Sequence, residues 1–182
     1  MNWKIDPAHS QITFSIRHMM ISNVHGRFDK FDGIVNFNEE DPAKSTVDVK
    51  IDAASISTRE PNRDNHLRSA DFLDVEKYPF ITFVSKRIEK IDSNHGRIFG
   101  DLTIKNISHE VVLDVEYAGQ SSMWGKTSAG FDASTRFNRK DWNLNWNKVL
   151  ESGGWLVGDE INVNIELELV KETEKEKAPQ TS

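Results

Sequence analysis

Hydrophobic and polar residues alternate along most of the chain, in short runs separated by turns. The most regular run is at 161–169, where apolar residues at every second position alternate with asparagine and glutamate. A period of two places successive side chains on opposite faces of a β-strand. Similar runs lie at 3–5, 12–20, 24–37, 47–51, 80–85, 98–104, 111–117 and 127–135. The pattern predicts an antiparallel barrel of about eight strands, a number that can enclose one small ligand.

Two segments interrupt the alternation. The first, at 60–76, gathers charged, histidine and aromatic residues and predicts a short helical crossover that serves as a lid or plug. The second, at 138–147, is too polar for a strand, too short for a long helix, and holds two tryptophans. Residues 93–96, Ser-Asn-His-Gly, are typical of a hairpin turn. Gly26 and Gly33 are interpreted as bends or bulges within the run at 24–37.

The length of 182 residues predicts one domain, with a barrel over 1–170 and a charged, disordered tail over 171–182. The formal net charge of −6 argues against nucleic acid or an anionic membrane surface as the main partner. The chain has no cysteine, which excludes disulfides, thiol nucleophiles and cysteine-ligated zinc. It shows no signal peptide and no apolar run of membrane-spanning length, so we expect a cytoplasmic protein.

The inner wall of the barrel is expected to follow the period-two positions of the separate strands. These positions are Phe14, Ile16, Phe28, Phe37, Val49, Ile51, Phe83, Leu102, Ile104, Leu113, Val115, Phe131 and Ile165. Some inward residues are small, namely Gly100, Ala129, Ala133 and Val49, and they favour a cavity over a packed centre. His18 lies on the same face as Phe14 and Ile16. It is either a hydrogen-bonded core histidine or a polar anchor inside an apolar cavity.

The charged residues of the crossover are the other candidates for a site. Arg59, Arg63 and His66 would meet a polar or phosphate head at the barrel mouth, because the arginine fork matches phosphate oxygens. The spacing of Arg63 and Asp64 favours a structural salt bridge or helix cap over such a role. The six histidines form no spacing typical of a metal site, so neither a metal nor another cofactor is expected.

Segments at 5–20, 24–37, 55–85, 100–117, 130–142 and 157–170 resemble, in this order, the YceI-like family. His9-Ser10, the Arg-Asp-x-His-Leu block at 63–67 and Gly-Asp-Leu-Thr at 100–103 make the combination specific. The resemblance implies a lipocalin-like barrel that binds polyisoprenoids and related lipids, and a homodimer. Two turns depart from the family pattern, at 105–108 and at 141–143. In the second, Trp142 near the barrel end would alter the pocket length or the fit of a headgroup.

The sequence therefore predicts an all-β, eight-stranded antiparallel lipocalin-like barrel with a short helical crossover. Its expected function is non-catalytic binding, storage or transport of a long apolar ligand: a polyisoprenoid, an isoprenoid quinone or a fatty-acid derivative. One alternative is an enzyme acting on a lipid or small hydrophobic substrate, with Arg63, Asp64 and His66 at the mouth. Another is a structural module whose barrel is fully packed.

Overall fold

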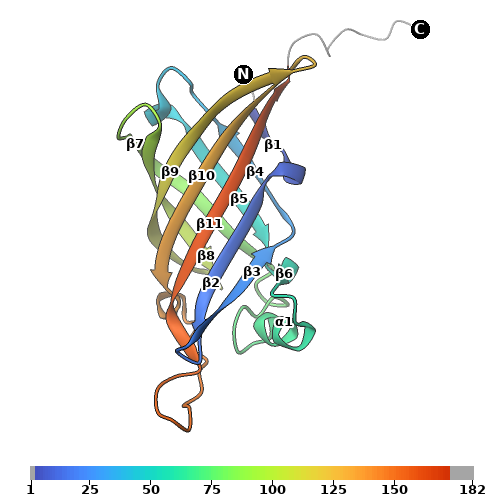
Figure 1. The fold of residues 1–182 in the computed structure, drawn as a ribbon, viewed down its shortest axis with the longest axis vertical. Coiled ribbons are helices and arrows are strands. Elements are labelled where there is room, and N and C mark those ends of the chain that lie inside the picture. The colour runs from blue at the N-terminus through green and yellow to red at the C-terminus, as the bar shows by residue number, and fades with distance from the viewer. Residues whose placement is uncertain (1–2, 173–182) are drawn as a thin grey trace, which may run out of the picture.

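The computed structural model describes residues 3–172 and shows one antiparallel sheet closed into a barrel (Figure 1). Each strand of the ring pairs with the next, and the last pairs back to the first. The predicted eight-stranded barrel is thereby confirmed. The ring consists of β1 (Trp3–Ile5), β4 (Phe31–Asn36), β5 (Thr46–Asp52), β7 (Phe80–Lys90), β8 (His95–Ile104), β9 (Ile107–Met123), β10 (Lys126–Asn138) and β11 (Val157–Glu172).

Three further strands widen one side of the barrel: β2 (Gln11–His18), β3 (Ser22–Phe28) and β6 (Ile56–Ser57). The long strand β11 pairs with β2 along its first part and with β1 along its last part. Between β1 and β2 the chain makes a 3-10 turn, η1 (Pro7–His9), capped by Asp6, which accepts a hydrogen bond from Ala8 N at 2.9 Å. The run at 24–37 divides into β3 and β4 because β3 pairs with β2, whereas β4 pairs with β1 and β5.

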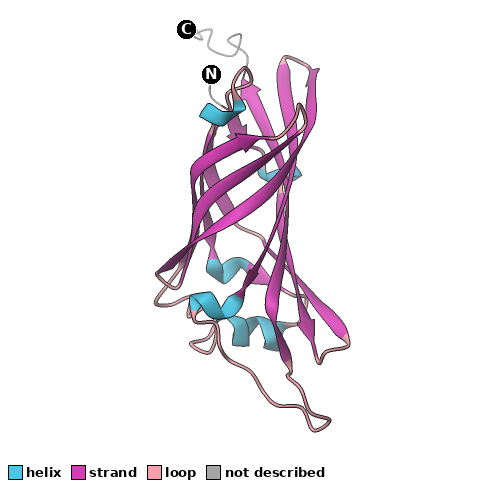
Figure 2. Ribbon diagram, turned by 90° about the vertical axis from the view of Figure 1, so that its left-hand side faces the viewer, coloured by secondary structure: helices cyan, strands magenta, loops and turns pink. Residues whose placement is uncertain are grey.

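The two ends of the barrel differ. We call the end with the β7–β8 and β9–β10 hairpins the upper end. The lower end carries the β2–β3 turn, the helix α1 (Pro61–Arg68) and the segment 139–156, which begins with the 3-10 turn η4 (Arg139–Trp142). Short helices gather at this lower end (Figure 2). The remaining 3-10 turns are η2 (Pro42–Lys44) and η3 (Ala53–Ser55).

Gly26 and Gly33 are not bends or bulges, because both lie in strands whose pairing register continues past them. A Cβ on Gly26 would lie 2.3 Å from Cζ of Phe14, and one on Gly100 would lie 2.4 Å from Cζ of Phe83. These two glycines let an aromatic ring on the neighbouring strand lie across the backbone. Gly100 therefore makes room for Phe83 and does not leave empty space, contrary to the sequence-based expectation.

The barrel runs two residues further than predicted, because β11 ends at Glu172 and Lys171 pairs with Trp3. The predicted disordered tail lies otherwise outside the described residues. Among those residues, none of the helices is both long enough and apolar enough to cross a bilayer.

Candidate functional site: a cavity along the barrel

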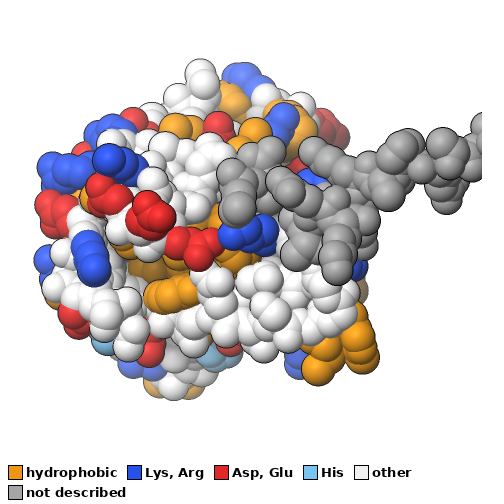
Figure 3. Space-filling view, turned by 90° about the horizontal axis from the view of Figure 1, so that it is seen from above, with side chains coloured by type: hydrophobic (Ala, Val, Ile, Leu, Met, Phe, Trp, Pro, Cys, Tyr) orange, Lys and Arg blue, Asp and Glu red, His pale blue; other side chains and the backbone are white. Residues whose placement is uncertain are grey.

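An elongated cavity of about 740 Å³ runs inside the barrel, and its lining is mostly aliphatic and aromatic. At the upper end it reaches the β7–β8 hairpin and the β4–β5 connection, and at the lower end it reaches α1 and the segment 139–157. Viewed onto the upper end, the molecule shows a hollow with hydrophobic side chains inside, flanked by acidic and basic ones (Figure 3). The cavity therefore extends over most of the barrel length.

Every residue predicted for the inner wall borders this cavity, and so does His18. Contact of these residues with a ligand stays a prediction. The small residues behave differently from one another. Ala133 and Val49 border the cavity. Ala129 does not border the cavity; it is fully buried in a small hydrophobic cluster with Trp3, Val35 and Leu169.

An aromatic cluster narrows the upper part of the barrel. The ring centroids of Phe37 and Phe131 lie 5.1 Å apart, and those of Tyr117 and Phe131 are also 5.1 Å apart. All three rings border the cavity. The predicted wall omitted Tyr117 and many aliphatic neighbours, although these residues also lie at period-two positions of their strands. The larger group includes Ile5, Ile12, Val24, Val35, Ile98, Ile161, Val163 and Leu167.

Arg63 and Asp64 hold the turn that precedes α1. Arg63 donates from Nε to Thr58 Oγ1 at 2.7 Å and from Nη2 to the Thr58 carbonyl oxygen at 2.9 Å. The buried Asp64 carboxylate accepts from the backbone N and the hydroxyl of the same Thr58, at 2.8 and 2.5 Å. This geometry supports the structural interpretation of the pair, although Arg63 also borders the cavity. Arg59 is exposed, has a φ of 65° and does not border the cavity, so its contact with a headgroup stays a prediction that the cavity lining does not support.

His66 joins α1 to the segment 139–156. Its Nε2 lies 2.8 Å from Asp71 Oδ2. Its ring stands edge-on to Trp146, with centroids 4.6 Å apart, and to Phe72, at 5.1 Å. His66, Phe72 and Trp146 all border the cavity, so the crossover closes against the lower end of the barrel.

Trp142 is a wall-supporting residue behind the cavity. It is 1% exposed, and its Nε1 donates to the carbonyl oxygen of Leu102 at 2.9 Å. Its ring packs against Phe137 and His109, with centroids 4.7 and 5.2 Å apart. It does not border the cavity, and an influence of Trp142 on pocket length or headgroup fit stays a prediction.

His18 has the surroundings of a polar anchor. Its ring is half-buried and borders the lower part of the cavity. Within the described chain its imidazole has no hydrogen-bond partner, which removes the interpretation as a paired core histidine. Two donor or acceptor nitrogens are thus available to a ligand.

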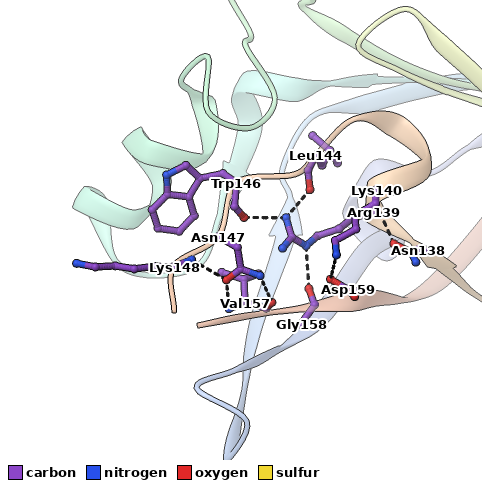
Figure 4. A network of polar contacts seen from close by, with 10 residues as sticks. All are labelled: Asn138, Arg139, Lys140, Leu144, Trp146, Asn147, Lys148, Val157, Gly158 and Asp159. Atoms are coloured by element: carbon purple, nitrogen blue, oxygen red, sulfur yellow. Dashed lines mark hydrogen bonds and ion pairs between the residues drawn. The ribbon is translucent and has the colours of Figure 1, made fainter. Parts of the chain in front are cut away.

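Sequence analysis did not single out Arg139, which is 1% exposed and borders the cavity at the lower end. Its Nε donates to the Gly158 carbonyl at 2.8 Å, and its Nη1 donates to the carbonyls of Leu144 and Trp146, the latter at 2.9 Å (Figure 4). Among the described residues Nη2 has no partner. Burial lowers the pKa of this guanidinium, and the charge of Asp159 opposes the shift. Asp159 itself lies 3.3 Å from Lys140 Nζ.

One group among the described residues has the spacing of a metal site: Asp6, His9 and Glu168. The Asp6 carboxylate already caps η1 and lies 2.8 Å from His9 Nδ1. This hydrogen bond raises the pKa of His9 and lowers the pKa of Asp6. None of the three residues borders the cavity. Asp6 and His9 stabilise the η1 turn.

The sequence matches the model of the YceI-like domain over residues 3–169. A similar protein is the UPF0312 protein SAS2572 of Staphylococcus aureus strain MSSA476. It is 37% identical over 162 residues, which cover 88% of this chain and 92% of the relative.

Solved structures with the same fold include the Campylobacter jejuni YCEI protein, with a TM-score of 0.74 and 35% identity over 86% of this chain and 90% of that one. Burkholderia cenocepacia BcnA has a TM-score of 0.77 at 24% identity, covering 90% and 98% of the two chains. A polyisoprenoid binding domain from Saccharophagus degradans has a TM-score of 0.65 at 14% identity, covering 93% and 98%. At these identities, BcnA and the Saccharophagus degradans domain show only that the fold is shared.

Proposed function

Because the chain belongs to the YceI-like family, we propose that its barrel binds a long apolar ligand and stores or carries it without chemical change. The observation that carries this proposal is the apolar cavity of about 740 Å³ along the barrel. Its volume falls within the range of about 300–1,000 Å³ that is usual for ligand pockets.

Burial of the ligand's hydrocarbon supplies the binding free energy. Each methylene moved from water into an apolar tunnel contributes about 0.8 kcal/mol. The ten residues of β8 extend over roughly 30 Å at about 3.3 Å per residue, which is enough to sheath a long tail. The shape of the cavity thus suits a linear ligand better than a compact one.

Three ligand classes fit this description: a polyisoprenoid, an isoprenoid quinone and a fatty-acid derivative. The Saccharophagus degradans domain named for polyisoprenoid binding shares this fold, and it supports the first class by analogy only. We also expect a homodimer, on the strength of the family resemblance.

The enzyme alternative has less support in the geometry. Arg63 and Asp64 are engaged with Thr58, and the His66 side chain is hydrogen-bonded only to Asp71 within the described residues. Acyl transfer needs a nucleophile hydrogen-bonded to the histidine ring, and among the described residues no hydroxyl or amine is hydrogen-bonded to the imidazole of His66.

Mass spectrometry of a solvent extract from the purified protein tests the proposal. We expect one long-chain species in near-stoichiometric amount, and recovery of the same species unchanged after incubation with the protein. A protein that yields no lipid and does not take up any neutral apolar fluorophore would contradict ligand binding. Conversion of the lipid into a product would support the enzyme alternative.

A further inference from the structure

The carboxylates of the described cavity lining are confined to its upper end, where Lys90, His95 and Arg97 line it as well. The acidic residues of the lining, Glu39, Glu89 and Asp92, lie in the β4–β5 connection and the β7–β8 hairpin of the upper end. At the lower end the described lining contains no carboxylate, and its ionisable residues are Arg17, His18, Arg63, His66 and Arg139. The lower end is therefore the place where the cavity favours a negative charge.

Arg139 is the most deeply buried of these cations. Its three hydrogen-bond acceptors are neutral backbone carbonyls, and the nearby Asp159 is paired with Lys140. Buried charges are normally paired with an opposite charge, because taking an ion out of water is costly. Its Nη2 group keeps both donors without a partner in the described structure. Buried unsatisfied donors are rare and call for an explanation.

We infer that the lower end binds the carboxylate of a long-chain acid, with Arg139 Nη2 as its donor and the hydrocarbon tail extending toward the upper end. This inference rests on the proposed function and narrows its ligand to the fatty-acid class. His18, which also borders the lower end and has a free imidazole, is placed to donate to the same head.

The hydrogen bonds already made by Arg139 favour a carboxylate over a phosphate. A phosphate head carries roughly 1.5 to 2 negative charges and three acceptor oxygens, so it needs more donors than a carboxylate with one charge and two oxygens. In Arg139, Nε and Nη1 are both occupied by carbonyls, so Nη2 alone remains. Nη2 is closed to solvent in this conformation, so a head must displace neighbouring side chains to reach it, and a compact head displaces less than a bulky one.

The test uses the full chain, stripped of lipid, and displacement of the neutral fluorophore N-phenyl-1-naphthylamine at neutral pH. Hexadecanoate should bind about tenfold more tightly than hexadecanol, the gain of one charge-assisted hydrogen bond. Hexadecyl phosphate should bind no more tightly than hexadecanoate. A large excess of sodium acetate should leave the acid-to-alcohol ratio unchanged. If acetate abolished the preference for hexadecanoate over hexadecanol, the cation would bind any free carboxylate whether or not it carries a tail. That result would overturn the inference.

In Arg139→Gln the ratio of acid to alcohol affinity should fall to about one while hexadecanol still binds. The matched control is Arg136→Gln, on the outer face of β10, whose side chain is 71% exposed. It should keep the wild-type ratio. If Arg63→Gln removes the preference and Arg139→Gln does not, the head lies at Arg63 and the inference is wrong.

Arg139 also holds three backbone carbonyls, so its replacement risks unfolding the lower end. A measurement on the wild-type protein covers that case. In ¹³C NMR of carboxyl-labelled hexadecanoate, the bound carboxyl should titrate at a lower pH than the carboxyl of the same acid in detergent micelles. A raised pKa would place the head in apolar surroundings and overturn the inference. If acid and alcohol bind equally, only this inference fails; if neither binds, the proposed function fails too.

Discussion

The Arg63 side chain gives two hydrogen bonds to Thr58, and Asp64 receives two from the same residue. Thr58 is 4% exposed, so its polar groups depend on these partners for satisfaction. A buried donor or acceptor left without a partner costs about 1–3 kcal/mol. The pair therefore fixes the start of α1, and with it the closure of the lower end.

We expect Arg63→Ala to lower the free energy of unfolding by about 1–3 kcal/mol, because it leaves the Thr58 carbonyl without this donor. For a protein of this size that corresponds to a fall in Tm of roughly 2–12 °C. The measurement is a thermal melt of the lipid-free protein. The control is Arg59→Ala, an exposed neighbour whose side chain makes no hydrogen bond among the described residues, and this change should alter Tm little. Equal effects of the two changes would contradict the structural role of Arg63.

Sequence analysis missed the burial of Arg139 and the wall-supporting role of Trp142, because both depend on how the folded chain brings backbone carbonyls to these side chains. Arg139 stands in a polar run, where an arginine is normally solvated. It is buried because the carbonyls of Leu144, Trp146 and Gly158 converge on it. Trp142 likewise acquires its role from Leu102, which is 40 residues away in the sequence. No local pattern encodes such convergence.

At the scale of elements, the strands were predictable because a closed barrel imposes alternation on every one of them. Phe14 on β2 and Phe83 on β7 face inward as their period-two positions indicated. The pattern gave neither the division of 24–37 into β3 and β4 nor the role of the glycines. Both depend on which strand lies alongside, and a single sequence does not report that pairing.

The glycines opposite aromatic rings provide a prediction about strand pairing. Gly100→Ala should destabilise the barrel by about 1–3 kcal/mol, as overpacking does, because the new Cβ would lie 2.4 Å from Cζ of Phe83. Urea unfolding followed by tryptophan fluorescence measures the change. Gly130→Ala is the matched control, since its Cβ would meet nothing closer than Ala118 Cβ at 3.5 Å.

If Gly100→Ala is as stable as the wild type, the ring of Phe83 has another place to go, and the packing argument fails. The double variant Gly100→Ala with Phe83→Leu should recover part of the loss relative to the two single variants, because the smaller side chain gives the methyl group space. Additive effects would show that the two residues do not interact.

At the scale of the whole molecule, the same side chains serve stability and border the cavity. Most members of the two buried hydrophobic clusters belong to the cavity lining. Residues such as Phe14 and Val115 both pack against a cluster and border the cavity, so their replacement would change both properties. Replacement of a cavity residue that contributes little to packing would change the binding affinity and leave the stability unchanged.

Ala133 meets this requirement, because it borders the cavity and its side chain is small. In Ala133→Trp the indole should extend into the cavity and occupy space that the ligand needs, so the affinity for a neutral long-chain alcohol should fall at least about tenfold, the loss of roughly two buried methylenes. The Tm of the lipid-free protein should stay the same or rise, because the indole gains apolar contacts in the cavity. Displacement of N-phenyl-1-naphthylamine and a thermal melt measure the two effects. Ser134→Trp, on the exposed face of the same strand, is the control and should leave the affinity unchanged. A variant that keeps its affinity would show that the ligand binds elsewhere, and one that loses Tm and affinity together would point to a packed barrel interior in place of a binding cavity.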